Sequence, residues 1–319
     1  MAAYTWTTDV ASGVYKNHII SKKLRRAAIV DTVFQQYVKV ESGFGKHKGE
    51  TMNLRRIKNL AIPTNARLSE QTRIPIDTFQ TATNAITIAE WGRGVEYTNF
   101  AKDLESFDLD GEIGTALKRQ LKVVTDNAAA AAFTAATNFV IAIPTGLSAV
   151  TWDTDGTPST AATVNANVQL LGIIRDQMRD TYQIPFYEKN FYAGIASTKF
   201  LRGIKSDPDF QFWRQYLQPG DVLMNSEVGS VEQIRFAESN NTAALSNAKG
   251  TGSVLGEAVI FGEDAVVMVE VEPFELRAAI PGDFGRFKAV AWVGVGEWGS
   301  PWANTAVAGE IRIVRVTSS

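Results

Sequence analysis

The sequence predicts an α+β fold in which a long extended hairpin leads into a long helix, with further strands late in the chain. Two strand-like runs joined by a polar tip lie between Lys48 and Asn99. Apolar residues then recur every three or four positions from Asp108 to Ala135, the spacing of one helix face. Alternating strand-like runs occupy 287–295 and 310–316. This mixture of helical and strand patterns predicts the α+β class.

Composition sets the expected size and class of the protein. Its 319 residues exceed one typical domain, so two domains or one elaborated domain are expected. A hydrophobic content of 45% and a charged content of 21% are ordinary for a folded chain. No window approaches 18 consecutive apolar residues, and the first ten residues lack a secretory pattern. We therefore expect no association with a membrane.

The rarity of reactive side chains argues against catalysis. The chain has no cysteine and only 2 histidines, His18 and His47. Thiolate chemistry is excluded, and a zinc site or a Ser-His-Asp triad is disfavoured, so both histidines are interpreted as surface residues. No phosphate-binding loop, dinucleotide motif or Gly-x-Ser-x-Gly elbow occurs. We expect no enzymatic activity and no catalytic, cofactor-binding or metal site.

Two groups of carboxylates have simpler explanations than metal binding. Asp103/Glu105 and Asp108/Asp110 stand where helices are predicted to begin, where capping and the helix dipole favour acidic residues. Calcium binding there is the alternative. The run 153–156 contains part of a calcium-loop pattern without the remaining ligands, and we interpret it as a turn.

Charge is distributed unevenly along the chain. Residues 1–60 contain 11 basic and 4 acidic residues, whereas 254–285 contain 7 acidic residues and 1 basic residue. Separate basic and acidic zones on a nearly neutral chain suit dense packing of copies, because opposite patches can meet between neighbours. Charges scattered on a solvated surface are the alternative interpretation.

The first 47 residues are predicted to form an N-terminal arm containing one amphipathic helix. Its apolar positions are Ile29/Val30, Val33/Phe34 and Tyr37/Val38, and Ser42–Gly45 ends it. A basic cluster precedes this segment: Lys22, Lys23, Arg25 and Arg26. Such a cluster can contact phosphates through charge alone. A solvated helix face is the alternative.

The hairpin at 48–97 is the most informative feature. Residues 51–57 read as one strand, 63–73 as the tip, and 74–88 as the returning strand. Trp91–Gly94 is predicted to be a turn or bulge, after which the strand resumes. A two-stranded ribbon is marginal on its own in water. This hairpin must therefore lie on something else, which favours a subunit that assembles with copies of itself.

Local signals predict the remaining elements. Thr98 or Asn99 caps a short helix ending near Glu105, and Asp108 or Asp110 caps a helix of about 28 residues, roughly 42 Å long. Further helices are expected at 161–181 and after Ser197, interrupted at Asp207-Pro208. Strands are expected within 139–160, 184–196, 222–237 and 254–271, and a loop at 239–253. The glycine-rich segment 294–301 is predicted to separate the last two strand runs.

Four segments together resemble the major capsid proteins of tailed phages, which have the Hong Kong 97 fold. The branch that includes the coat protein of phage N-four is the most similar. The segments are Gly49–Leu54, Ile86–Asn99, Glu227–Phe236 and Val259–Ala265. They occur in the family's order and spacing. Two features differ from the branch, namely Gln233, where glycine is common, and the tryptophan-rich C-terminus.

The resemblance implies a specific organisation. The N-terminal arm (1–47) and the extended loop (48–97) would be followed by a peripheral domain (98–150 and 254–319) with the long spine helix. An axial domain (151–253) would be inserted into it. Hexamers and pentamers would close into an icosahedral virion shell around double-stranded DNA, assembled in the host cytoplasm. A separate scaffolding protein and a portal are implied partners, with a decoration protein left open. Some members form a lysine–asparagine crosslink, for which Lys58 and Asn304 offer the residue types.

The resemblance also directs attention to specific side chains. We expect residues of the extended loop to contact a neighbouring subunit: Arg55, Arg56, Arg67, Glu70 and Arg73. We expect the basic cluster of the arm, Lys22, Lys23, Arg25 and Arg26, to face the lumen near DNA.

Two other functions remain open on the sequence. A nanocompartment shell of the encapsulin type has the same fold and encloses protein instead of DNA. A soluble hydrolase or binding module would need a constellation of residues that the sequence does not display.

Overall fold

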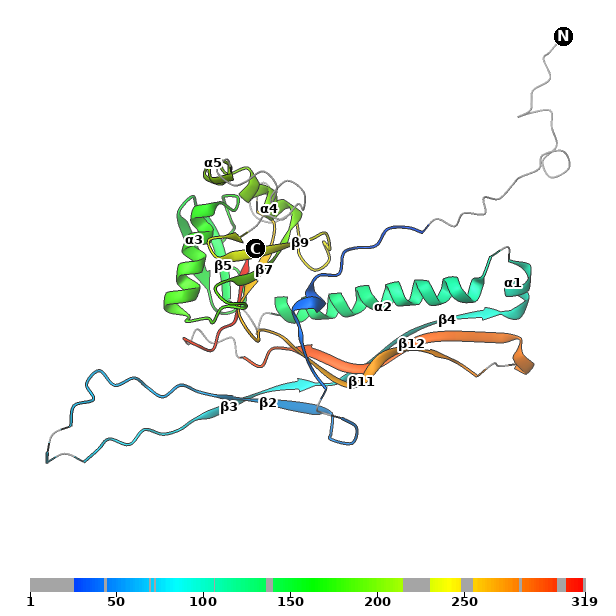
Figure 1. Cartoon of the computed structure of the whole chain (residues 1–319), viewed down its shortest axis with the longest axis horizontal. Coiled ribbons are helices and arrows are strands. Elements are labelled where there is room, and N and C mark those ends of the chain that lie inside the picture. The colour runs from blue at the N-terminus through cyan, green and yellow to red at the C-terminus, as the bar shows by residue number, and fades with distance from the viewer. Residues whose placement is uncertain are drawn as a thin grey trace, which may run out of the picture.

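The protein is elongated, with a compact unit at one side, a long helix lying on a sheet, and a projecting hairpin (Figure 1). The structure is a computed structural model, and it describes residues 26–42, 45–68, 70–71, 73–105, 107–135, 140–214, 230–247, 255–280, 283–302 and 308–317. Within these residues, no helix has the length and apolar character needed to cross a membrane. The α+β class predicted from the sequence is confirmed.

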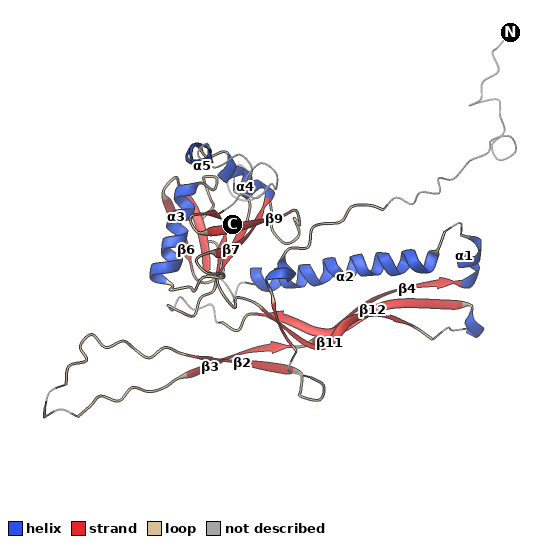
Figure 2. Cartoon of the chain, in the orientation of Figure 1, coloured by secondary structure: helices blue, strands red, loops and turns tan. Residues whose placement is uncertain are grey.

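A four-stranded sheet supports the long helix. Its order is β1 (Lys39–Glu41), β11 (Val267–Ala278), β12 (Phe287–Gly299) and β4 (Ala89–Thr98). The helix α2 (Leu109–Thr134) has 26 residues and is about 39 Å long. Trp292 of β12 is buried beneath it and donates a hydrogen bond to Gln120 of α2 over 3.1 Å. Figure 2 shows the helix lying along this sheet.

The compact unit is built on a seven-stranded sheet. Its order is β6 (Ala149–Asp153), β5 (Val140–Gly146), β13 (Ile313–Val316), β10 (Ala258–Phe261), β7 (Tyr192–Ser197), β9 (Ile234–Ser239) and β8 (Ser230–Val231). Its helices are α3 (Val168–Asp176), which continues as a π-helical turn Gln177–Thr181, α4 (Thr198–Lys205) and α5 (Pro208–Arg214). The central strands are apolar and buried on both faces, as strands inside a core are.

The sheet order bears on the predicted domain boundaries. The predicted axial domain, 151–253, contains β7, β8 and β9, whereas β5, β10 and β13 fall in the predicted peripheral domain. Hydrogen bonding joins all six strands in one sheet. The seven-stranded sheet therefore crosses the predicted boundaries, and the division into domains stays a prediction.

The extended hairpin lies within the predicted range 48–97 but is shorter than predicted, because its returning strand begins at Thr81 and residues 89–98 pair with β12 instead. Strands β2 (Thr51–Ile57) and β3 (Thr81–Thr87) pair antiparallel, with Thr51 opposite Thr87 and Ile57 opposite Thr81. Leu54 and Ile86 are buried against Val269 of β11. The base of the hairpin is therefore anchored to its own chain.

The helix predicted in the N-terminal arm is wrong. Residues 26–33 are not helical, and the arm contains only a 3₁₀ turn, Phe34–Tyr37. Phe34 is fully buried, with its ring 5.9 Å from that of Phe133, and the ring of Tyr37 lies 5.3 Å from that of Phe261. These aromatic contacts fill a gap between α2 and the compact unit, so packing overrides the helical spacing.

The turn predicted at Trp91–Gly94 is also wrong, because β4 runs through it without interruption. The glycines serve close packing instead. A Cβ on Gly94 would lie 2.9 Å from the Cβ of Ala291 on β12. The predicted break at 294–301 likewise begins too early, since β12 continues to Gly299.

Most helix starts follow the predicted caps. Thr98 accepts a hydrogen bond from the backbone of Ala101 over 3.1 Å and begins α1 (Asn99–Leu104). Asp108 precedes α2. The helix predicted from 161 begins later, at Val168, because the side chain of Asn167 caps it by accepting from the backbone of Leu170 over 2.7 Å.

Gln233 occupies a position that suits glycine. It lies with Glu232 in the two-residue turn between β8 and β9, with φ angles of 62° and 48° respectively. Left-handed backbone is unfavourable for residues with a side chain. Arg175 of α3 donates two hydrogen bonds to the side-chain oxygen of Gln233, over 3.1 and 2.7 Å. These bonds offset the strain where the similar branch commonly has glycine.

Candidate inter-subunit interface

The distal part of the extended hairpin projects away from the rest of the chain (Figure 1). Beyond the strand pair, Lys58 donates a backbone hydrogen bond to Gln80 over 3.1 Å, and the chain then forms an open loop. We call residues 58–80 the extended loop from here on. Its large apolar side chains are exposed: Leu60, Ile62, Leu68, Ile74, Ile76 and Phe79.

These apolar residues form a surface that water solvates poorly. Ile62 is 94% exposed and Ile76 is 78% exposed. Burying one such side chain contributes about 1.5–3 kcal/mol. Leu60/Ile62 and Ile74/Ile76 recur at every second position, so in extended chain each pair lies on one face. A group of large, exposed apolar side chains is typical of a protein interaction site.

Four of the five predicted contact residues are exposed, and the described residues offer them no ion-pair partner. Arg55 lies on the outer side of β2, and Arg67, Glu70 and Arg73 lie on the extended loop. Their charges remain available to another molecule. That they contact a neighbouring subunit stays a prediction.

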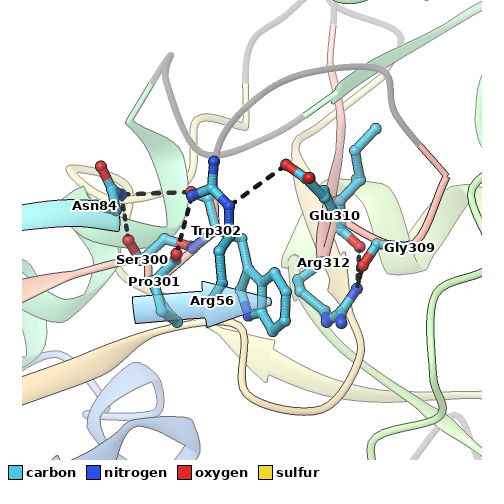
Figure 3. A network of polar contacts seen from close by, with 9 residues as sticks. Arg56, Asn84, Ser300, Pro301, Trp302, Gly309, Glu310 and Arg312 are labelled. Atoms are coloured by element: carbon cyan, nitrogen blue, oxygen red, sulfur yellow. Dashed lines mark hydrogen bonds and ion pairs between the residues drawn. The ribbon is translucent and has the colours of Figure 1, made fainter. Parts of the chain in front are cut away.

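Arg56 has a different environment. Its Nε lies 3.4 Å from Oε2 of Glu310, and the two side chains are 10% and 12% exposed. Its Nη1 donates to the backbone oxygen of Pro301 over 3.3 Å (Figure 3). The structure thus places Arg56 at the root of the hairpin, which we define as the contacts of Arg56 and Asn84 with 300–302 and Glu310. That Arg56 also contacts a neighbouring subunit stays a prediction.

Asn84 of β3 provides the second attachment of the root. Its side-chain amide donates to the backbone oxygens of Ser300 and Trp302, over 2.5 and 3.4 Å (Figure 3). One strand of the hairpin is thus held by an ion pair and the other by hydrogen bonds. Both attachments are to the segment that follows β12.

The described residues of that segment are held by further contacts. The guanidinium of Arg312 lies 3.8 Å from the ring centroid of Trp302 and donates to the backbone oxygen of Gly309 over 2.7 Å. Burial lowers the pKa of Arg312, and nearby carboxylates such as that of Asp264 oppose this effect. Trp302 donates to the backbone oxygen of Asp264 over 2.8 Å. The residues to which the hairpin is attached are therefore themselves fixed by contacts with the rest of the chain.

The basic cluster of the arm is only partly described. Lys22, Lys23 and Arg25 lie outside the described residues, as does Asn304, the crosslinking partner considered for Lys58. Arg26 forms a two-point ion pair with Glu112 of α2, over 2.5 and 3.0 Å. Its charge is thus engaged by the chain itself. A lumenal, DNA-facing position for the four residues stays a prediction.

Asp110 and Asp153, two of the acidic residues considered for calcium, have partners within the chain. Lys102 lies 2.6 Å from Asp110, and its hydrogen bond lowers the pKa of that carboxyl group. The backbone of Asp155 donates to Asp153 over 3.2 Å, and this bond is the main cause of the lowered pKa of Asp153. No cluster of three or more potential metal-binding side chains occurs in the part of the chain that the structure describes.

Sequence reasoning found the hairpin but missed its most exposed feature. The alternation of Leu60 with Ile62 and of Ile74 with Ile76 was a usable signal for an apolar surface. No sequence pattern indicated the contacts at the root, because Glu310 and Pro301 lie more than 200 positions from the hairpin residue that they contact.

Comparison with solved structures gives a consistent result. The capsid asymmetric unit of cyanophage Pam1 is 12% identical, with 100% of this chain and 99% of that chain covered and a TM-score of 0.73. The head structure of Helicobacter pylori bacteriophage KHP40 is 12% identical over 100% and 99%, with a TM-score of 0.70. The acidic stable capsid of Helicobacter pylori bacteriophage KHP30 is 12% identical over 97% of each chain, with a TM-score of 0.69.

Sequence comparison gives no further guide, since no family model and no curated protein matches the chain. The structural likeness nevertheless extends over nearly the whole of each chain, so it concerns the complete architecture of hairpin, long helix and compact unit. This chain therefore has the fold of tailed-phage capsid proteins, the Hong Kong 97 type expected from the sequence.

Proposed function

We propose that this chain is the major capsid protein of a tailed bacteriophage and that its copies assemble into the icosahedral shell of the head. The observation that carries the proposal is the apolar extended loop projecting from a rigid root. A soluble monomer would gain nothing from exposing these side chains, whereas a neighbouring copy would bury them. The likeness to capsid structures over nearly the full chain supports the same conclusion.

The form of the contact favours rings of subunits. The extended loop is an elongated projection, and its partner on the neighbouring copy is a different surface. Contacts between two different surfaces repeat around an axis and generate rings when the rotation closes. Hexamers and pentamers are the rings that an icosahedral shell requires. Each contact can be modest in strength, because every subunit makes several at once.

The partners follow from this role. The shell encloses double-stranded DNA, which its lumenal surface contacts without sequence specificity through basic side chains. Assembly takes place in the host cytoplasm with a separate scaffolding protein and a portal. The protein acts as a structural component of the virion and not as an enzyme.

Electron microscopy of the purified full-length protein tests the proposal. We expect closed shells or rings of uniform size. Removing 61–73 should abolish them, as should Ile62→Ser combined with Ile76→Ser. Leu147→Ser is the matched control, because Leu147 is an exposed apolar residue in the turn between β5 and β6.

Two results would count against the proposal. A protein that remains monomeric at all concentrations and salt conditions would contradict self-assembly. Shells that contain a protein cargo and no nucleic acid would contradict the viral role and favour a nanocompartment of the same fold.

A further inference from the structure

A cavity lies where the root of the hairpin meets the compact unit. We call it the root cavity. Its walls are formed by the end of β2 with the residues that follow it, by Gln183 and Pro185, and by Trp302 with residues of the segment 308–312 that leads to β13. Its volume is about 500 Å³, within the range of about 300–1,000 Å³ that is usual for ligand sites. The root cavity can therefore hold a small molecule together with ordered water.

Positive charge predominates around the root cavity. The charged side chains on its walls are three basic residues and one acidic residue: Arg56, Lys58, Arg312 and Glu310. This composition leaves a net charge of +2. Asp264, a further carboxylate near Arg312, lies 3.4 Å from the ammonium group of Lys39. An excess of positive charge in a partly enclosed site attracts an anion.

Arg312 is a buried cation without a direct counter-charge. The residue is 9% exposed, and its Nη1 donates to the backbone oxygens of Gly309 and Ile311 over 2.7 and 2.9 Å. Its Nε is buried and makes no hydrogen bond, and no carboxylate among the described residues forms an ion pair with it. The undescribed stretch 303–307 contains no acidic side chain. Since a buried charge is costly unless it is paired, an anionic ligand would account for the position of Arg312.

Arg56 has a second donor that no hydrogen bond satisfies. Its Nε is buried and makes no hydrogen bond, although it lies 3.4 Å from Oε2 of Glu310. The contact from its Nη1 to the backbone oxygen of Pro301 is long, at 3.3 Å. Buried polar groups in folded proteins are nearly always hydrogen-bonded. Two arginines with such donors line the same cavity (Figure 3), which indicates a ligand that accepts from both.

Two exposed side chains add further donors to the root cavity. Lys58 is exposed and has no ion-pair partner in the described part of the chain. Asn59 lies beside Gly309, where an added Cβ would come within 3.2 Å of the amide nitrogen of Asn59. An oxyanion with several oxygens can accept from guanidinium, ammonium and amide groups at once, and arginine and lysine commonly bind phosphate. A carboxylate has only two oxygens and would use fewer of these donors.

We propose that the root cavity binds a phosphate group, as inorganic phosphate or a small phosphate monoester. Its oxygens accept from Arg56 and Arg312 on the cavity wall and from Lys58 at the exposed edge. The bound anion thereby connects β2 to the segment before β13 and supplies the negative charge that Glu310 alone does not. A DNA duplex is a poorer match, because a rigid duplex cannot bring its backbone against arginines that are 9% and 10% exposed.

Equilibrium dialysis of the full-length protein against radiolabelled inorganic phosphate tests the inference. The ionic strength is held constant with sodium chloride, so that general screening does not change. We expect one saturable site per chain, with a dissociation constant of about 1 mM or tighter. Lys58→Gln should weaken binding at least about threefold, because a charged donor is lost. Lys122→Gln should leave the affinity unchanged, since Lys122 is an exposed lysine on α2 that does not line the cavity.

A second pair of variants tests the sign of the charge. Asn59→Asp places a negative charge at the root cavity and should weaken binding at least about tenfold. Asn53→Asp, on the exposed side of β2, should leave the affinity unchanged. The four substituted positions are exposed, so these variants keep the fold intact. Absence of a saturable site, or equal affinities in the variants and their controls, would overturn the inference.

Amide hydrogen exchange locates the bound phosphate. Phosphate should slow exchange at the end of β2 and in 308–312, relative to chloride at equal ionic strength, and should leave α4 unchanged. Unchanged exchange at both places would overturn the inference. Displacement of the labelled phosphate by a short DNA duplex would also overturn it, in favour of a nucleic-acid backbone. These measurements need no assembled shell, so their outcome is separate from that of the proposed function.

Discussion

Removing the carboxylate of Glu310 tests whether its ion pair with Arg56 stabilises the root of the hairpin. At 3.4 Å, and with an effective dielectric constant of 20, the attraction between Arg56 and Glu310 is about 5 kcal/mol before the cost of desolvation. Loss of one partner from a buried ion pair costs about 3–5 kcal/mol. Arg56 keeps its hydrogen bond to Pro301 and a small exposed fraction. We therefore expect Glu310→Ala to destabilise the root by about 3 kcal/mol, the lower end of that range.

Amide hydrogen exchange of β2 and β3 in the isolated subunit measures this effect, because it reports the free energy of local opening. Exchange should accelerate by a factor of about 100 or more in Glu310→Ala. The double variant Arg56→Met with Glu310→Leu should be less affected than either single variant, since no buried charge is left unpaired. Glu96→Ala is the control, because Glu96 is exposed on β4 and has no ion-pair partner among the described residues.

Either of two results would contradict this prediction. Exchange in Glu310→Ala equal to that of the unmodified protein would show that the ion pair does not hold the root. A double variant damaged as much as the sum of the single variants would show that the two side chains act independently.

Three further predictions concern the supporting structure. Arg175→Met should lower the free energy of unfolding in denaturant by about 1–2 kcal/mol. In a Gln233→Gly background, where glycine needs no stabilising hydrogen bonds, the same change should cost less than about 0.5 kcal/mol. Equal costs in the two backgrounds would contradict this prediction. Gly94→Ala should destabilise the fold by about 1–3 kcal/mol, since the new Cβ would lie 2.9 Å from that of Ala291. Gly114→Ala on α2, where a Cβ would meet open space, should be neutral or stabilising. Equal melting temperatures for the two variants would contradict this prediction. Burial raises the pKa of Asp126, so the folded state binds this proton more tightly than the unfolded chain, and stability is lost as the pH rises through the raised value. Asp126→Asn should remove this loss, and unfolding curves that show the same pH dependence in both proteins would contradict it.

Features set by neighbouring residues were predictable from the sequence. The cap at Thr98, the start at Asp108 and the long helix depend on side chains within a few positions of one another. The extended hairpin was also predictable, because its strand runs and its polar tip are continuous in the chain. That the ribbon must lie on another surface followed from the instability of an isolated ribbon, and its base does lie on β11 of the same chain. Completion of the extended loop by a neighbouring copy stays a prediction.

Features set by distant contacts were not predictable. The helical spacing at 29–38 does not produce a helix, because Phe34 packs against Phe133 and Tyr37 packs against Phe261. Gly94 signals a turn in isolation and serves close strand packing in the fold. The root depends on Glu310, whose role becomes visible only when β2 and the last strands are brought together.

We propose that another copy of the chain completes the extended loop. A cryo-electron microscopy reconstruction of the assembled protein, with residues 58–80 traced, tests it most directly. We expect Ile62 and Ile76, which are exposed in the single chain, to be buried against a neighbouring subunit in each ring. A reconstruction in which the loop lies on its own chain, or remains in solvent within an intact shell, would contradict it.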